Sequence, residues 1–266
     1  MASTARRRIK ASMEVFDPRH TLELATKQSY TDNVFLFVPN LIGYTRVLLA
    51  AMALHYMSYH PKYCTVLYCI SSLLDAVDGQ AARALGQASK FGAVLDMVTD
   101  RCATACLLTY LASAYPNKAL LFQFIIALDF ASHYMHMYSS LVTGSKSHKL
   151  VTSDVSRILW WYYNDSRVLF LMCAGNEAFF VALYLAKWLQ TPTVASVPFF
   201  GDLTWAGVAA LCCAPISFVK NAINVVQLWK ASKMLVGVDI AERQAAREKA
   251  LAGQAGVAVR EKDESE

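Results

Sequence analysis

Four aspartates stand out because they are the only acidic residues within 33–128. Asp75 and Asp78 are three residues apart, and Asp96 and Asp100 are four residues apart. Residues at these spacings share one face of an α-helix, so each pair presents its two carboxylates together. Acidic groups in apolar segments cost free energy, and they indicate a functional site.

The arrangement favours divalent-metal chemistry. Four carboxylates brought together repel one another or take up protons, and Arg83 and Arg101 supply only two positive charges nearby. Hard oxygen ligands suit Mg²⁺ or Mn²⁺, and two such ions would form a clamp for phosphoryl chemistry. The alternative is that the acids only form ion pairs with arginines and loop cations. That alternative explains neither the spacing nor the small residues Gly79, Ala82 and Gly92 beside them.

The composition limits the classes of protein to which the chain can belong. Of its 266 residues, 56% are hydrophobic and 17% are charged, whereas soluble domains have about 25% charged residues. This disfavours a disordered chain, a nucleic-acid-binding arm and an ordinary soluble enzyme. The seven cysteines contain no C-x-x-C pair, so neither a disulfide framework nor a zinc site is expected.

Six apolar stretches are long enough to cross a bilayer, which needs about 20 residues each. They cover residues 35–58, 63–85, 91–114, 119–142, 168–189 and 203–229. The sequence therefore predicts an all-α integral membrane protein built as a six-transmembrane-helix bundle. The second and third stretches contain the four aspartates and are less apolar than a lipid-facing helix.

The distribution of Lys and Arg predicts the topology. These residues concentrate in 1–33, in the connections after the second and fourth stretches, and in the C-terminal segment. The positive-inside rule places both termini and these connections in the cytosol. We expect a cytosolic leader over 1–33, a membrane domain over 34–230 and a charged cytosolic tail over 231–266. Residues 17–32 form either a short interfacial helix or a solvated leader.

The chain resembles the CDP-alcohol phosphatidyltransferases in their signature, D-x2-D-G-x2-A-R-x8-G-x3-D-x3-D. The signature positions are filled by Asp75, Asp78, Gly79, Ala82, Arg83, Gly92, Asp96 and Asp100. Eight fixed residues over 26 positions make this a specific signal.

The resemblance extends beyond the signature to about residues 34–230. The following segments resemble the branch of the family that uses inositol as its acceptor: 35–46, 73–76, 96–102, 132–136, 144–148 and 173–177. One position departs from the pattern. Many family members have Thr three residues after the Pro-Asn dipeptide, where this chain has Gly43.

The resemblance implies an activity: transfer of the phosphatidyl group of CDP-diacylglycerol to myo-inositol, which releases CMP. The four aspartates would hold two divalent ions, Mg²⁺ or Mn²⁺, and Asp100 would be the base for the acceptor hydroxyl. Six residues are implied in CDP-diacylglycerol binding: Gly79, Ala82, Arg83, Gly92, Asn40 and Arg46. The resemblance also implies a homodimer among the lipids of the endoplasmic reticulum membrane, with the active site open to the cytosol.

The fourth apolar stretch has one polar face. Asp129, Ser132, His133 and His136 follow i, i+3, i+4, i+7 spacing on an otherwise apolar helix. In one interpretation these residues form the inositol pocket together with Lys146, because inositol needs convergent hydrogen-bond partners. In the other they form a structural polar seam against a neighbouring helix. The sequence leaves both interpretations open.

Three alternative functions are weighed against this prediction. A divalent-metal transporter would spread polar groups along a full pathway, whereas here they concentrate near one end of the second and third stretches. An intramembrane prenyltransferase would carry two separated Asp-rich motifs rather than one contiguous cluster. A family member with another acceptor, such as glycerol 3-phosphate, serine or an amino alcohol, is compatible with the signature, but the flanking resemblance favours inositol.

Overall fold

The computed structural model describes residues 21, 24–25, 33–143, 165–189 and 204–263. Every regular element within these ranges is helical, which confirms the all-α prediction. The long helices are α3 (Val38–Tyr56), α4 (Pro61–Ala84), α5 (Lys90–Ala114), α6 (Ala119–Val142), α8 (Ser166–Trp188) and α9 (Trp205–Asp263). Two short 3-10 helices, η1 (Val34–Leu36) and η2 (Pro116–Lys118), precede α3 and α6.

The helices begin where capping chemistry allows. Proline lies in the first turn of α3 and of α4, where its missing N–H costs no hydrogen bond. The Ser89 side chain caps α5 by accepting a 2.9 Å hydrogen bond from the backbone N–H of Gly92. Asp165 caps α8 by accepting from the N–H of Arg167 at 2.8 Å. Each of the six predicted stretches therefore begins within a few residues of an observed helix.

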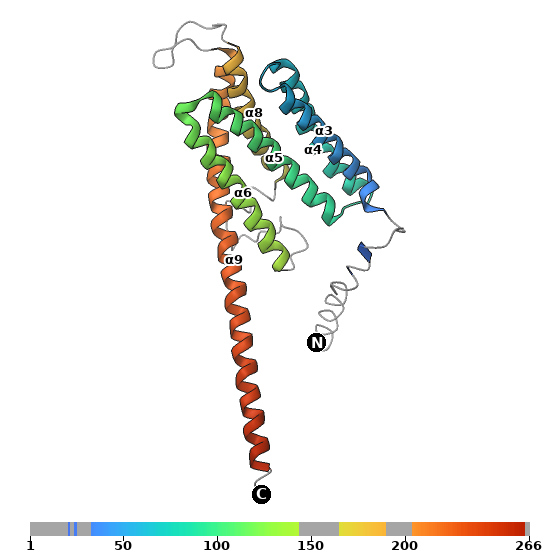
Figure 1. Cartoon of the computed structure of the whole chain (residues 1–266), viewed down its shortest axis with the longest axis vertical. Helices are drawn as coiled ribbons and strands as arrows, with labels where there is room; N and C mark the ends of the chain where they lie inside the picture. The colour runs from blue at the N-terminus through green and yellow to red at the C-terminus, as the bar shows by residue number, and fades with distance from the viewer. Residues whose placement is uncertain (1–20, 22–23, 26–32, 144–164, 190–203, 264–266) are drawn as a thin grey trace.

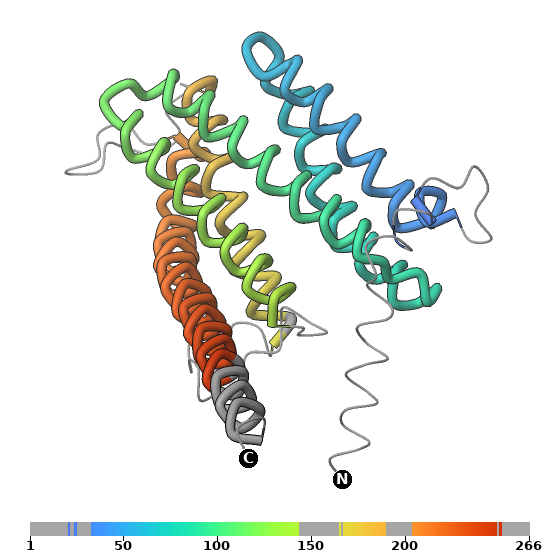
Figure 2. The backbone as a smooth tube through the Cα atoms, turned by 60° about the horizontal axis from the view of Figure 1, so that its bottom comes forward, coloured from blue at the N-terminus to red at the C-terminus, as the bar shows by residue number. Residues whose placement is uncertain are grey.

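The helices alternate in direction along the bundle (Figure 2). α3 and α4 form one closely packed pair, and α6, α8 and α9 form a second group. α5 packs against α3 on one side and against α6 and α8 on the other (Figure 1). The end of α4 and the start of α5 thus lie at the same end of the bundle, which brings the two aspartate pairs together.

Away from the aspartates the bundle has a hydrophobic core. Its buried members are Ala53, Met57, Cys64, Tyr68, Leu107, Leu108, Leu111, Phe122, Phe180 and Tyr184. Two tyrosines tie the helices together there, because the Tyr184 hydroxyl donates to the carbonyl of Met57 at 2.8 Å and the Tyr115 hydroxyl donates to that of Leu183 at 2.9 Å. This packing fixes α8 against the α3–α4 pair and against α5.

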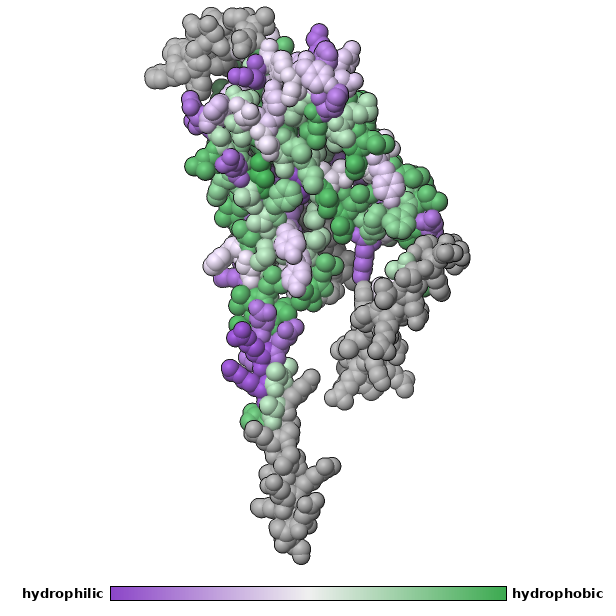
Figure 3. Space-filling model, viewed as in Figure 1, coloured by the Kyte–Doolittle hydropathy of each residue, from purple (hydrophilic) through white to green (hydrophobic). Residues whose placement is uncertain are grey.

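The outside of the bundle is apolar. Large side chains such as Leu48, Phe124 and Phe218 are exposed, and hydrophobic residues cover the middle of the face in Figure 3. Extended apolar surface of this kind marks contact with a membrane or a partner. Two helical segments, Arg167–Trp188 and Trp205–Glu248, are long and apolar enough to cross a membrane. The chain is thus suited to association with membranes.

The two predicted terminal segments differ in how much of them the structure describes. The predicted leader over 1–33, including residues 17–32 with their two alternatives of an interfacial helix or a solvated segment, lies almost wholly outside the described residues. At the other end α9 continues without a break to Asp263 and projects beyond the other helices (Figure 1). Most of the predicted tail is therefore part of one long helix.

Glycine permits α3 to approach α5 closely. A Cβ at Gly92 would lie 2.6 Å from Oδ1 of Asn40 and 3.0 Å from Oγ of the capping Ser89. Asn40 is 1% exposed, and its Nδ2 donates to the carbonyl of Val34 at 2.6 Å, so it has little freedom to move away. Gly43 lies opposite Leu95, whose Cδ2 would be 2.9 Å from an added Cβ. Gly43 of α3 thus takes part in helix packing.

We predict that Gly92→Ala lowers the melting temperature of the purified protein. The added methyl group displaces Asn40 or disturbs the Ser89 cap, and overpacking of this kind costs about 1–3 kcal/mol. Gly79→Ala is the matched control, because the nearest atom to its Cβ would be the Arg83 guanidinium at 3.6 Å. The control should melt at or above the wild-type temperature, since Ala is favoured over Gly in helices by about 1 kcal/mol. Equal melting temperatures for the two variants would contradict the prediction.

Candidate active site

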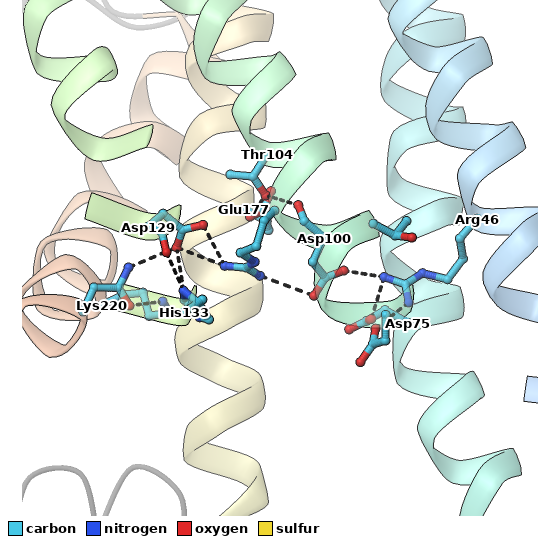
Figure 4. Close-up of polar contacts among 12 residues, drawn as sticks. Arg46, Asp75, Asp100, Thr104, Asp129, His133, Glu177 and Lys220 are labelled. Atoms are coloured by element: carbon cyan, nitrogen blue, oxygen red, sulfur yellow. Dashed lines mark hydrogen bonds and ion pairs between the residues drawn. The ribbon is translucent and has the colours of Figure 1, made fainter. Parts of the chain in front are cut away.

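Arg46 lies at the centre of the four aspartates (Figure 4). Its guanidinium is 2.6 Å from Asp75, 2.7 Å from Asp78 and 2.7 Å from Asp96, and it also contacts Asp100. The Arg46 side chain is only 2% exposed, whereas Asp75 and Asp96 are partly open to solvent. One cation from α3 therefore joins carboxylates from α4 and α5.

The donor set fits hard divalent cations. One carboxylate oxygen from each of Asp75, Asp78 and Asp96 lies within 4.8 Å of the other two. Four carboxylates around Arg46 leave an excess of negative charge, which Arg101 beside Asp100 only partly offsets. Carboxylate oxygens are the ligands that Mg²⁺ and Mn²⁺ prefer. The cluster that the spacing predicts is thus assembled from both helices.

Asp100 also connects the cluster to the second group of helices. Its Oδ2 accepts a hydrogen bond from Nη2 of Arg101 at 3.3 Å. Nη1 of the same Arg101 donates to both carboxylate oxygens of Asp129 on α6, at 3.0 and 3.1 Å. A single guanidinium therefore links the predicted base to the predicted polar face of α6.

The polar face of α6 is built around Asp129. Ser132 is fully buried and donates to the Asp129 carbonyl at 3.0 Å. His133 places Nδ1 2.8 Å from that carbonyl and 3.5 Å from the Asp129 carboxylate. The backbone oxygen of His136 accepts hydrogen bonds from two serine hydroxyls one turn further on. Lys146 lies outside the described residues.

Helix α9 completes this polar region with residues that sequence reasoning missed. Nδ2 of Asn224 donates to Asp129 at 3.1 Å, and Nζ of Lys220 donates to Oδ1 of Asn224 at 2.6 Å. Lys220, Asn224 and Gln227 are all nearly inaccessible to solvent. Their signal is the same one that marks Asp129: polar residues at i, i+4 and i+7 on one face of an apolar stretch.

One acidic residue, on α8, was also assigned no role from the sequence. Glu177 on α8 accepts a hydrogen bond from the Tyr68 hydroxyl at 2.7 Å and another from the Thr104 hydroxyl at 2.8 Å. Its signal was available, because Glu177 is an isolated acid within the apolar stretch 168–189.

The remaining predicted residues lie around the cluster at the same end of the bundle. Gly79, Ala82 and Arg83 occupy the last two turns of α4, and Arg83 is exposed. Asn40 and Gly92 face each other between α3 and α5. The structure therefore gathers all the residues of the signature, together with Asn40 and Arg46, at one end of α3, α4 and α5.

Fold and site together define a class of protein. An apolar helical bundle with a carboxylate cluster suited to divalent cations is typical of membrane enzymes that act on phosphate esters. Comparison with known proteins narrows this class. The sequence model of the CDP-alcohol phosphatidyltransferase family matches residues 36–231, and the chain belongs to this family.

Curated relatives match most of the chain. It is 53% identical to the CDP-diacylglycerol–inositol 3-phosphatidyltransferase of Schizosaccharomyces pombe, over 81% of this chain and 95% of the relative. It is 45% identical to the human protein of that name, over 80% of this chain and 97% of the relative. A probable plant enzyme of that name, from Arabidopsis thaliana, is 36% identical over 82% of this chain and 97% of the relative. No solved structure matches the chain with statistical significance.

We predict that Arg46→Gln lowers the melting temperature sharply in the presence of a chelator. The substitution removes the guanidinium that separates four like charges, and breaking a buried charge pair is strongly destabilising. Excess Mg²⁺ or Mn²⁺ should restore much of the loss, because the ions compensate the same carboxylates. Arg83→Gln, which removes an exposed arginine beside the site, should shift melting little in either buffer. A chelator-independent loss in Arg46→Gln would argue against the charge-compensation role.

Proposed function

We propose that this protein transfers the phosphatidyl group of CDP-diacylglycerol to myo-inositol, giving phosphatidylinositol and CMP. The observation that carries the proposal is the assembly of the four signature aspartates into one carboxylate cluster around Arg46. The choice of acceptor rests on the names of relatives that this chain matches over nearly their full length. Glycerol 3-phosphate, serine or an amino alcohol as acceptor would fit the cluster but not those relatives.

The aspartates would hold the divalent ions. Asp75, Asp78 and Asp96 offer the closely spaced oxygens, and Asp100 adds a fourth carboxylate from the next turn of α5. When bound there, Mg²⁺ or Mn²⁺ would supply positive charge to offset the negative charge of the diphosphate. We propose that two such ions bind, with either Mg²⁺ or Mn²⁺ as the metal.

Asp100 is the proposed base. The oxygen of an inositol hydroxyl attacks the phosphorus of the phosphatidyl group, the P–O bond to CMP breaks, and the hydroxyl proton passes to the Asp100 carboxylate. Arg101 supports this role, because it holds Asp100 by one guanidinium nitrogen and Asp129 by the other. The Asp100 carboxylate therefore lies between Arg46 in the cluster and Arg101, which leads to α6.

Six residues around the cluster are proposed to bind CDP-diacylglycerol. Gly79 and Ala82 leave space on α4, and the exposed Arg83 offers its guanidinium to phosphate oxygens. Arg46 is the cation nearest the carboxylates, so its guanidinium is placed to compensate the negative charge of the bound diphosphate. Asn40 and Gly92 shape the α3–α5 side of the site.

We further propose that all six long helices span the membrane and that the cluster opens to the cytosol. The support is the concentration of Lys and Arg at the chain ends and in the connections after α4 and α6. Both termini would then be cytosolic. The endoplasmic reticulum location and the homodimer are proposed from the family resemblance.

A panel of acceptors tests the function. Purified protein supplied with CDP-diacylglycerol and Mg²⁺ or Mn²⁺ should release CMP with inositol, and far less with serine, glycerol 3-phosphate or choline. Proteoliposomes should take up no metal in the absence of this reaction. CMP release that is faster with another acceptor would overturn the assignment of inositol, and metal uptake without CMP release would favour a transporter.

Asp100→Asn is the inactive control for this panel. The amide keeps the size of the side chain but cannot accept the hydroxyl proton, so CMP release should fall below detection. The variant should still fold and bind CDP-diacylglycerol. Near-normal activity in purified Asp100→Asn would remove Asp100 as the base.

We also propose that the region around Asp129 binds inositol. Asp129, Ser132, His133, His136 and Lys146 are the proposed pocket residues. The link from Asp100 through Arg101 to Asp129 supports this, because the acceptor hydroxyl must lie close to the base. The buried hydrogen bonds among these residues are also what a structural seam requires, so measurement decides between the two.

We predict that His133→Ala raises the KM for inositol about tenfold while the KM for CDP-diacylglycerol changes little. Loss of one hydrogen-bonding group from a polar pocket typically costs about 1–2 kcal/mol of binding. Ser140→Ala is the control, since Ser140 lies on the same helix and donates to a backbone oxygen away from Asp129. If His133→Ala leaves the KM for inositol unchanged, the polar face is a seam.

A further inference from the structure

Helices α4 and α5 carry the two aspartate pairs but scarcely pack against each other. α4 packs mainly on α3, whereas α5 packs on α3, α6 and α8. The distance between the pairs is therefore set by side chains from other helices that contact both. In the part of the chain that the structure describes, two polar side chains form hydrogen bonds or ion pairs with both helices: Arg46 from α3 and Glu177 from α8.

Glu177 binds the same helix faces that carry the aspartates. Tyr68 precedes Asp75 by seven residues on α4, and Thr104 follows Asp100 by four residues on α5. These spacings place each hydroxyl on the face of its neighbouring aspartate. One oxygen of the Glu177 carboxyl group accepts a hydrogen bond from the Tyr68 hydroxyl, and the other accepts one from the Thr104 hydroxyl. Figure 4 shows Thr104 beside Glu177.

The two bracing residues differ in what competes with them. Arg46 is held by the aspartate carboxylates themselves, so divalent cations compete with it for those oxygens. In the part of the chain that the structure describes, the hydrogen bonds of Glu177 come from hydroxyl groups outside the cluster, so they persist when the carboxylates bind a cation. Thr104 also lies 3.0 Å from the carbonyl oxygen of Asp100, so its anchor is next to the proposed base.

We propose that Glu177 is a positioning residue that sets the separation of the two aspartate pairs through Tyr68 and Thr104. It acts without touching a cation or a substrate. The inference rests on the proposed function only in that the pairs work together on divalent ions. Its role is distinct from that of its neighbour Asn176, which accepts a hydrogen bond from Ser217 at 2.8 Å and so contacts α9 instead.

The test compares Mn²⁺ binding with turnover in purified protein. Glu177→Gln keeps one acceptor oxygen but replaces the other by an amide NH2 group that can only donate, so one of the two hydroxyls loses its acceptor. Mn²⁺ affinity, measured by electron paramagnetic resonance, should fall about tenfold, as is typical when a residue supporting metal ligands is replaced. The kcat for CMP release should fall by a similar factor, whereas the KM for inositol and for CDP-diacylglycerol should change less than about threefold.

Matched variants separate positioning from general stability. Tyr68→Phe removes one anchor with the ring retained, and it should weaken Mn²⁺ binding in the same direction but by less. Adding Tyr68→Phe to Glu177→Gln should cost less than the sum of the two, because both break one interaction. Asn176→Ala should leave Mn²⁺ affinity within about twofold of wild type, a factor that corresponds to a small free-energy change.

Specific results would overturn the proposal. Wild-type Mn²⁺ affinity in Glu177→Gln would do so, and so would an equal loss in Asn176→Ala. If Glu177→Gln does not fold, Tyr68→Phe and Thr104→Val decide, and unchanged Mn²⁺ affinity in both contradicts the role of Glu177. If the wild-type protein releases no CMP with inositol, the proposed function fails, yet the Mn²⁺ comparison still tests Glu177.

Discussion

The rest of the structure depends on the compensation of four carboxylates at one end of an apolar bundle. Like charges at this distance repel strongly in a low-dielectric environment, and the buried Arg46 guanidinium is the cation that contacts all four of them. This requirement brings α3 against α4 and α5. It explains why glycine is found where α3 approaches α5, because any side chain at Gly92 would displace Asn40 from that contact.

The need to compensate buried charges also applies to the second group of helices, α6, α8 and α9. An ionised group inside an apolar bundle is stable only when it is paired, so each charged side chain needs a polar or oppositely charged partner. Arg101 is paired with both Asp100 and Asp129. Asp129 also accepts a hydrogen bond from Asn224, and Asn224 accepts one from Lys220. The polar groups thus form one continuous path from the carboxylate cluster to α9. α5 is central to this path because it is the helix that contacts both halves of the bundle.

The sequence predicts the parts of this arrangement that depend on local patterns. Apolar runs locate the helices, and the spacing of Asp75, Asp78, Asp96 and Asp100 assigns each pair to one helix face. The partners of buried groups do not follow from such patterns, because they are set by packing between helices far apart in the chain. Lys220 and Glu177 show this: their types in apolar stretches signal a role, but only the fold reveals that they meet Asn224 and Tyr68. The continuation of α9 to Asp263 rests on helix propensity rather than on burial, since its last part is rich in Ala, Glu, Arg and Gln but has no apolar run.

The placement of the signature bears on how the acceptor is chosen. All eight signature residues lie on α4 and the first half of α5, the part of the chain that carries the pattern shared across the family. A pattern common to enzymes with different acceptors cannot by itself discriminate between those acceptors. Discrimination must come from groups that reach the proposed base, Asp100, without belonging to the signature. Arg101 provides that connection, because it leads from Asp100 directly to Asp129 and hence to α6 and α9. The choice of alcohol is therefore expected to depend on the polar side chains of these two helices.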